Sequence, residues 1–252
     1  MERIKLFPIS FFALVLGFVG FALAIQKAEH LLYFPSIISS SSIVSGILWF
    51  SIGITISISA IYLMKIIFFY SVFKSEYNHP IKINFYPIIA KTLLIYSIIF
   101  LESNISLSKT LWILGALLQF IFSIKIISSW MCMNFDIKQI NPSWFIPIVG
   151  SVIVPITGVA HGFTELSWFF FSGGLIWWLI LFIFVLFRII FQNKLEEKFL
   201  PTLYILFAPP SIAFISTVKL TGELTDFGRI LYHISLLCFI QRPRPERINF
   251  KI

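Results

Sequence analysis

The chain has 252 residues, of which 58% are hydrophobic and only 12% are charged, and its mean hydropathy is +0.95. Because this apolar share is well above that of soluble domains, the composition excludes a water-soluble globular protein and indicates an integral membrane protein. The net charge is +8, but the basic residues stand singly between apolar runs and form no patch that would indicate a nucleic-acid partner.

Apolar stretches of membrane-spanning length recur along the whole chain. We expect eight transmembrane helices, at residues 8–26, 43–64, 84–101, 109–131, 143–162, 167–191, 200–218 and 226–240. The runs are continuous and about twice as long as a barrel strand, which argues against a transmembrane β-barrel. The sequence therefore predicts an all-α integral membrane protein, with one transmembrane domain over residues 1–241 and a basic cytoplasmic tail over 242–252.

The first span follows Arg3 and Lys5, as the apolar core of a signal peptide would. Its apolar run is longer than is typical of such a core, and no convincing small-residue cleavage site follows it. We therefore expect the first span to be retained as a transmembrane helix.

Lysine and arginine are distributed unequally over the predicted loops. Fourteen of them fall on the side of the membrane that holds both termini, four fall on the opposite side, and Lys91 lies within a span. The positive-inside rule then places both termini in the cytoplasm. The expected location is the plasma (inner) membrane, which the chain crosses several times.

Prolines mark only the odd-numbered predicted spans. The residues concerned are Pro8, Pro87, Pro142, Pro147, Pro155, Pro201, Pro209 and Pro210. A proline removes a helical hydrogen bond and kinks the axis, which is tolerated in a membrane where other helices or a water-filled cavity satisfy the backbone. The pattern predicts four helical hairpins, with kinked odd helices inside and straight even helices outside. The alternative is that the prolines only suit a tightly packed bundle.

Three sequence segments carry a resemblance to a known family. They are EYNHPIKINF at residues 76–85, NPSWFIPIVG at 141–150 and PTLYILFAPPSIAF at 201–214. They resemble the tellurite-resistance/dicarboxylate transporter family, which comprises TehA-like proteins, fungal malate and sulfite transporters and plant slow anion channels. The resemblance runs from about Phe7 to about Ile240.

The resemblance implies ten helices in five hairpins, a central anion pore between kinked inner helices, and a homotrimer of separately conducting subunits. It also implies that a phenylalanine on the ninth helix closes the pore. Here the eighth predicted span is followed by the basic residues of the tail, so helices nine and ten have no counterpart. Two functions remain open: passive movement of small anions or C4-dicarboxylates, linked in the family to tellurite resistance, or a truncated, non-conducting remnant or interaction subunit.

Candidate pore-lining residues follow from their positions on the odd-numbered spans alone. They are Phe11, Gly17, Pro87, Lys91, Pro155, Pro209 and Phe214. Lys91 lies about 10 Å into the third span at the helical rise, where a charge is rare and often functional. Its ammonium could attract anions into the pore, or its long stem could carry the charge back to the interface.

Residues for catalysis or for metal and cofactor binding are not predicted. The sequence contains no glycine-rich nucleotide motif, no HExxH and no GxSxG, and Cys132 and Cys238 have no ligand spacing. The acidic residues fall in loops or at helix ends, which favours a passive pore over a proton-coupled pump. The glycine pairs Gly158/Gly162 and Gly173/Gly174 are expected to serve close helix packing.

Overall fold

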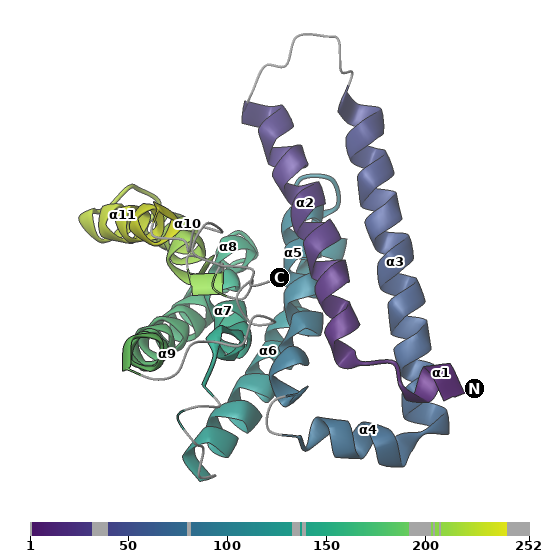
Figure 1. Ribbon diagram of the computed structural model, residues 1–252. Helices are drawn as coiled ribbons and strands as arrows, with labels where there is room; N and C mark the ends of the chain where they lie inside the picture. The colour runs from purple at the N-terminus through teal and green to yellow at the C-terminus, as the bar shows by residue number, and fades with distance from the viewer. Residues whose placement is uncertain are drawn as a thin grey trace, which may run out of the picture. The chain divides into compact units, whose positions relative to one another are not determined.

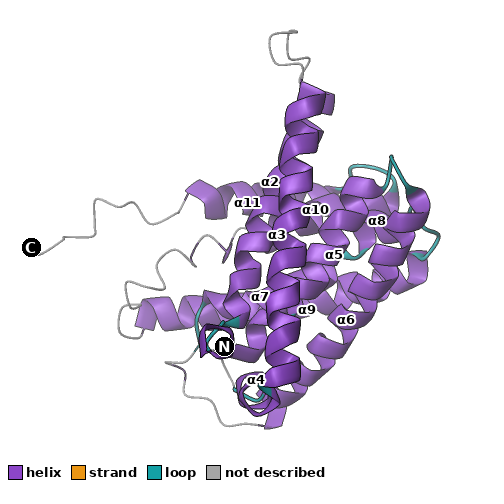
Figure 2. Cartoon of the chain, turned by 90° about the vertical axis from the view of Figure 1, so that its right-hand side faces the viewer, coloured by secondary structure: helices purple, strands orange, loops and turns teal. Residues whose placement is uncertain are grey.

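The chain is helical throughout the part that the computed structural model describes, which comprises residues 2–31, 40–79, 82–132, 137, 140–191, 203, 205–206 and 208–240. Figure 2 shows these residues as helices and connecting loops, with no strand among them. The α-helices are α1 (Glu2–Lys5), α2 (Phe12–Leu31), α3 (Ser40–Phe68), α4 (Tyr70–Tyr77), α5 (Pro87–Phe100), α6 (Ile105–Cys132), α7 (Phe145–Ile153), α8 (Pro155–Gly158), α9 (Thr164–Phe191), α10 (Ala208–Thr221) and α11 (Asp226–Ile240). Short 3₁₀ turns precede three of them: η1 (Ile9–Phe11), η2 (Lys82–Phe85) and η4 (Pro142–Trp144).

Five helices in the described part are long and apolar enough to cross a membrane. They cover Ile9–Ala28, Ser45–Phe68, Lys82–Phe100, Ile105–Cys132 and Thr164–Phe191, and a shorter apolar helix covers Pro142–Gly158. The predicted all-α membrane fold is therefore confirmed. The seventh and eighth predicted spans correspond to α10 and α11, which have 14 and 15 residues. Both are shorter than the ~20 residues of a full crossing, and the predicted tail at 242–252 lies outside the described residues.

The first compact unit covers Met1–Ser129. In it α2 and α3 lie side by side and antiparallel, and α5 packs on α2 (Figure 1). The helix α6 approaches α5 closely at Gly115, where an added Cβ would lie 2.9 Å from the Cγ of Leu94. The hydroxyl of Ser108 also donates to the carbonyl of Ser97 at 2.7 Å, which ties α6 to α5.

The second compact unit covers Trp130–Ile252. Its buried helix α7 packs against α9, and α10 packs on α7, α8, α9 and α11. At the first of these contacts an added Cβ on Gly174 would lie 2.7 Å from Val152, so only glycine allows this approach. The hydroxyl of Ser216 donates to the Val152 carbonyl at 2.5 Å and joins α10 to the same helix. Gly174 thus has the packing role predicted for it.

Gly162 has a different role from the predicted one. It has a φ of +83°, and nothing lies within 4 Å of an added Cβ. Beside it the Phe163 N–H donates to the Gly158 carbonyl at 2.9 Å, which closes the turn after α8. Gly162 therefore ends a helix, as glycine does in the left-handed conformation, and does not form a helix contact.

Several threonines within the apolar helices bond to the backbone of their own helix. Thr55, Thr92 and Thr217 each donate to the carbonyl four residues earlier, at 2.8, 2.9 and 2.8 Å. This back-bonding satisfies the hydroxyl within the helix itself, and Thr55 also shares a hydrogen bond of 2.8 Å with the Tyr96 hydroxyl. It is why serine and threonine do not interrupt the predicted spans.

The prolines of the odd spans lie at helix starts and helix breaks. Pro87 opens α5 directly after η2, and Pro155 opens α8 directly after α7. Pro209 and Pro210 lie in the first turn of α10. The helices α3, α6, α9 and α11 contain no proline, as the sequence predicts.

Candidate functional site

The span Lys82–Phe100 differs from the other long spans in its burial. In its most apolar 18-residue stretch, 67% is buried inside the protein. The corresponding share is 17% to 33% in the other four long spans. It nevertheless carries polar side chains, because Asn84, Lys91, Thr92 and Ser97 are all buried along it. A buried helix that keeps polar groups within a membrane domain is the first place to look for an ion pathway.

Lys91 is 4% exposed, so its ammonium does not return to the surface along its stem. Within the described ranges it forms no ion pair and no hydrogen bond. An isolated buried ammonium costs several kcal/mol unless an anion or a set of acceptors compensates it. The position is therefore suited to an anion that the chain itself does not supply.

Asn84 has the same property. Its side chain is fully buried, and neither its amide oxygen nor its amide nitrogen has a partner in the structure. Asn84 lies in the 3₁₀ turn η2, seven residues before Lys91 on α5. The span Lys82–Phe100 thus carries a lysine side chain and an amide donor that are both buried without a protein partner. Hydrogen-bond donors with no protein acceptor are what a small anion requires.

A second buried lysine in the same unit is fully partnered. Lys65 on α3 donates to the carboxylate of Glu76 at 2.5 Å and to the carbonyl of Phe7 at 2.7 Å. The Glu76 carboxylate also accepts from the Tyr62 hydroxyl at 3.2 Å and from the Ile9 N–H at 3.4 Å. This Lys65–Glu76 cluster joins the foot of α3 to α4 and to the start of the first span. Its charges are compensated, so we assign it a structural role.

The predicted pore-lining residues are divided between the two compact units. In the first unit Pro87 and Lys91 are buried, whereas Gly17 is exposed and Phe11 is 40% exposed and stacks on Phe7. In the second unit Pro155 and Pro209 are buried and Phe214 is half-buried. Within the first unit, the structure thus brings Pro87 and Lys91 onto one buried helix but leaves Phe11 and Gly17 on an exposed face. The pore-lining assignment as a whole stays a prediction.

Two sets of residues were not found from the sequence. In the sequence, Asn84 stands out only as part of a family motif, and Lys65 only as a charge that sets orientation. The presence of Asn84 seven residues before Lys91, on a span marked by a proline, is the sequence signal that could identify Asn84. Only the fold could reveal the second, because Phe7 and Glu76 are 69 residues apart in the chain.

Metal-binding chemistry has no candidate in the described ranges, where no three His, Cys, Asp or Glu side chains come together. Cys132 is exposed, Cys238 is half-buried, and both are free thiols. The buried lysines of the described part are Lys91 on the span Lys82–Phe100 and Lys65 in the ion-paired cluster at the foot of α3.

Residues 6–240 match the family described as voltage-dependent anion channel. The chain is 29% identical to the S-type anion channel SLAH3 of Arabidopsis thaliana over 97% of its own length and 39% of that protein's. It is 28% identical to an uncharacterised transporter of Methanocaldococcus jannaschii, covering 87% of this chain and 67% of the relative. It is 25% identical to the tellurite resistance protein TehA homolog of Haemophilus influenzae, covering 91% of this chain and 69% of the relative.

The chain spans 39% to 54% of the length of the plant channels and about two thirds of the microbial relatives. The match nevertheless covers nearly all of the chain, including the buried span with Asn84 and Lys91 and the cluster around Glu76. The apolar helices of the structure and this match agree on an integral membrane protein. The chain belongs to the voltage-dependent anion channel family.

Proposed function

We propose that the chain provides a passive pathway for small anions, with Lys91 and Asn84 as the groups that contact the anion. The observation that carries the proposal is the buried side-chain nitrogen of Lys91, which has no ion pair or hydrogen bond among the described residues, on the most buried of the long spans. Family membership supports it, since relatives include channels named for anions. A positive group on a low-dielectric wall attracts anions and repels cations.

Uncoupled movement fits the placement of the acidic side chains. Glu76 is the buried carboxylate of the described residues, and it is neutralised by Lys65 outside the face that carries Lys91. Glu102 and Asp226 lie at helix ends, largely exposed. A proton-coupled carrier needs a titrating group within the pathway. We therefore expect an anion to move down its own electrochemical gradient, and tellurite and C4-dicarboxylates are substrates to test beside chloride and nitrate.

We propose a multi-pass arrangement in the plasma (inner) membrane with both termini in the cytoplasm. The support is the unequal distribution of lysine and arginine, with fourteen on the side of the termini and four on the other. The expected homotrimer rests on the family resemblance alone. The foot of α3, with Lys65 and the neighbouring Lys74, is then at the cytoplasmic interface.

The test is an anion-flux assay on purified protein in liposomes, with an anion-sensitive fluorophore inside and an imposed gradient. We expect flux of chloride or nitrate that falls roughly tenfold or more in Lys91→Ala, since a charge-assisted hydrogen bond contributes about 1.5–3 kcal/mol. Lys91→Arg should keep most of the flux because it keeps the charge.

The matched control is Lys27→Ala, which removes a lysine that is 44% exposed and paired with Glu102. It should conduct as the unchanged protein does. Equal flux in Lys91→Ala and Lys27→Ala would overturn the assigned site. No flux from a folded, unchanged chain would instead favour a non-conducting remnant or an interaction subunit.

A further inference from the structure

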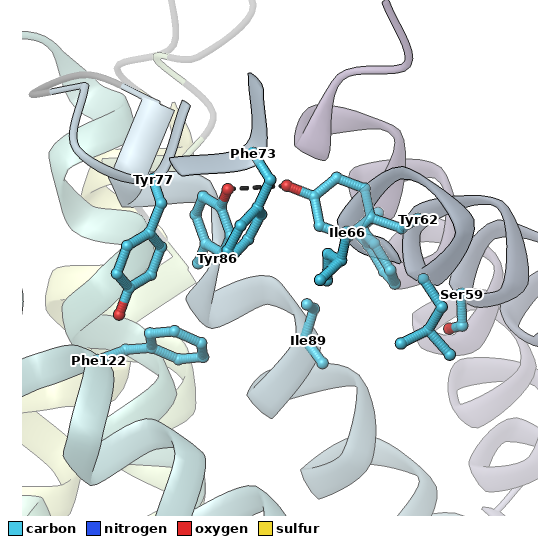
Figure 3. A pocket seen from close by; sticks show the side chains of 10 residues that line it. Ser59, Tyr62, Ile66, Phe73, Tyr77, Tyr86, Ile89 and Phe122 are labelled. Atoms are coloured by element: carbon cyan, nitrogen blue, oxygen red, sulfur yellow. Dashed lines mark hydrogen bonds between the residues drawn. The ribbon is translucent and has the colours of Figure 1, made fainter. Parts of the chain in front are cut away.

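A second feature of the first compact unit is an apolar cavity of about 410 Å³ near the foot of α3. Figure 3 shows its walls, which come from α3, α4, α6 and the span that contains Tyr86 and Ile89. The lining residues are Phe12, Ser59, Tyr62, Leu63, Ile66, Phe73, Tyr77, Tyr86, Ile89 and Phe122. The volume is within the range of sites that take small organic ligands.

The cavity offers almost no polar contact to an occupant. Four of its lining residues carry a hydroxyl, and two of these, Tyr62 and Tyr86, bond to each other at 2.7 Å, as the dashed line in Figure 3 marks. Tyr62 also donates to Glu76, on the far side from the cavity's aliphatic wall. The other polar groups of the wall are the hydroxyls of Ser59 and Tyr77, and none of the lining residues is cationic. The cavity is therefore poorly suited to a hydrated anion, and we do not count it as a branch of the proposed anion pathway. An aliphatic chain is the chemistry that it accepts.

The cavity is continuous with the lipid-facing surface of the chain. Leu63 lines it and is also 57% exposed, on a helix of which only 17% of the apolar window is buried. The outer face of α3 therefore contacts lipid chains beside the cavity. An acyl chain can reach the cavity sideways from the bilayer without crossing a polar layer.

The short helix α4 covers the cavity at the level of the membrane interface. It lies across the end of α3 in Figure 1 and turns Phe73 and Tyr77 into the cavity, while Lys74 between them is exposed. Aromatic rings on one face and a cation on the other are typical of a helix that lies in the headgroup layer. The cavity is therefore at the depth where an acyl chain joins its headgroup.

Cations without acidic partners surround this end. The Nζ atom of Lys125 lies 3.4 Å from the ring centroid of Tyr77, which lines the cavity, and Lys74 and Lys82 are exposed nearby in the chain. Among the residues that the structure describes, none of these three lysines forms a salt bridge. Each lysine near a surface contributes about 1 kcal/mol of attraction to anionic lipid.

We propose that this cavity holds one acyl chain of an anionic phospholipid, whose headgroup is bound at Lys125 beside α4. The apolar wall favours an acyl chain, and the lysines without acidic partners favour a negatively charged headgroup. The site is separate from Lys91 and Asn84 and does not depend on whether the chain conducts anions. It does depend on the helices lying in a membrane.

The test uses full-length protein in nanodiscs that contain a phosphatidylglycerol probe with a photoreactive diazirine in one acyl chain. A phosphatidylcholine probe with the same chain is the comparison. After irradiation, peptide mass spectrometry should place the label on residues 59–66, 73–77 or 122. The phosphatidylglycerol probe should label these peptides several-fold more than phosphatidylcholine.

Two variants test the binding of the acyl chain and the binding of the headgroup separately. Ser59→Phe fills the cavity and should remove the label with both probes. Lys125→Gln should lower labelling by the phosphatidylglycerol probe about fivefold, which corresponds to the attraction contributed by one lysine. Labelling by the phosphatidylcholine probe should not change in Lys125→Gln. Lys5→Gln is the control, because Lys5 is exposed on the same predicted side and does not line the cavity. It should label as the unchanged protein does.

Equal labelling by the two probes would overturn the anionic headgroup. Label spread along the outer face of α9, and unaffected by Ser59→Phe, would overturn the site itself. If Ser59→Phe does not elute as a folded protein, the ratio between the probes and the effect of Lys125→Gln still decide the proposal.

Discussion

Two buried lysines in one compact unit have opposite surroundings. Lys65 is 2% exposed and has a carboxylate, a backbone carbonyl and the ring of Tyr62 within reach of its ammonium. Lys91 is 4% exposed and has no partner in the described part of the chain. Burial alone therefore does not distinguish a structural charge from a functional one. The difference lies in whether the chain supplies the compensating charge.

The largest expected effect tests the compensated lysine. Glu76→Ala leaves the Lys65 ammonium buried without its partner, and breaking such a pair costs about 3–5 kcal/mol. We expect a drop of many degrees in the thermal midpoint of the detergent-purified protein, or loss of folded protein in size-exclusion chromatography.

Glu102→Ala is the control for this experiment, because Glu102 and its partner Lys27 are 58% and 44% exposed. Exposed pairs contribute only ~0–1 kcal/mol, so its midpoint should change little. Similar losses in both variants would show that the Lys65–Glu76 cluster is not the special contact that the structure indicates.

An intermediate effect tests how rigidly the helix of Lys91 is held. Gly115→Ala would put a Cβ 2.9 Å from Leu94 and 3.1 Å from the carbonyl of Ala90, next to Lys91. Overpacking of this kind costs ~1–3 kcal/mol. The measurement is the thermal midpoint together with anion flux, which should both fall.

Gly17→Ala is the matched control, since nothing lies within 4 Å of a Cβ added there. A helical alanine in that position is expected to be neutral or slightly stabilising. An unchanged midpoint for Gly115→Ala would mean that α6 yields easily and does not hold α5 in place.

The smallest expected effect on stability tests the uncompensated lysine. Lys91→Met removes a buried charge with no partner and keeps a flexible stem of similar length, so the midpoint should stay the same or rise. Lys65→Met should lower it, because it leaves the Glu76 carboxylate buried and unpaired. If the two variants lose the same stability, Lys91 has a structural partner and the contrast between the lysines is wrong.

The fold was largely predictable because lipid allows few solutions. A run such as residues 167–191 has no alternative to a helix, and the structure places α9 at Thr164–Phe191. Helix ends were harder, because they depend on local caps. Asn104 accepts from the Leu107 N–H at 3.0 Å and starts α6 four residues before the predicted position of 109. Gly162 was assigned to packing because its φ of +83° cannot be read from the sequence.

The candidate site was only partly predictable. Lys91 was singled out because a charge inside an apolar run is conspicuous, and the structure shows it buried. Asn84 was overlooked because an amide beside a loop is ordinary in a sequence, and only its unpaired, buried atoms make it notable. Phe11 and Gly17 were chosen by helix membership, which does not specify the direction in which a residue faces.

The contacts around Pro8 also have a consequence for the order in which the chain is assembled. The Ile9 N–H and the Phe7 carbonyl find their side-chain partners 67 and 58 residues later, in Glu76 and Lys65. During synthesis the first helix therefore reaches the bilayer before its anchor exists, and its leading amide must bond to interfacial water until the second helix and α4 have left the ribosome. The contacts at the start of the first helix can therefore be completed only after residue 76 has emerged.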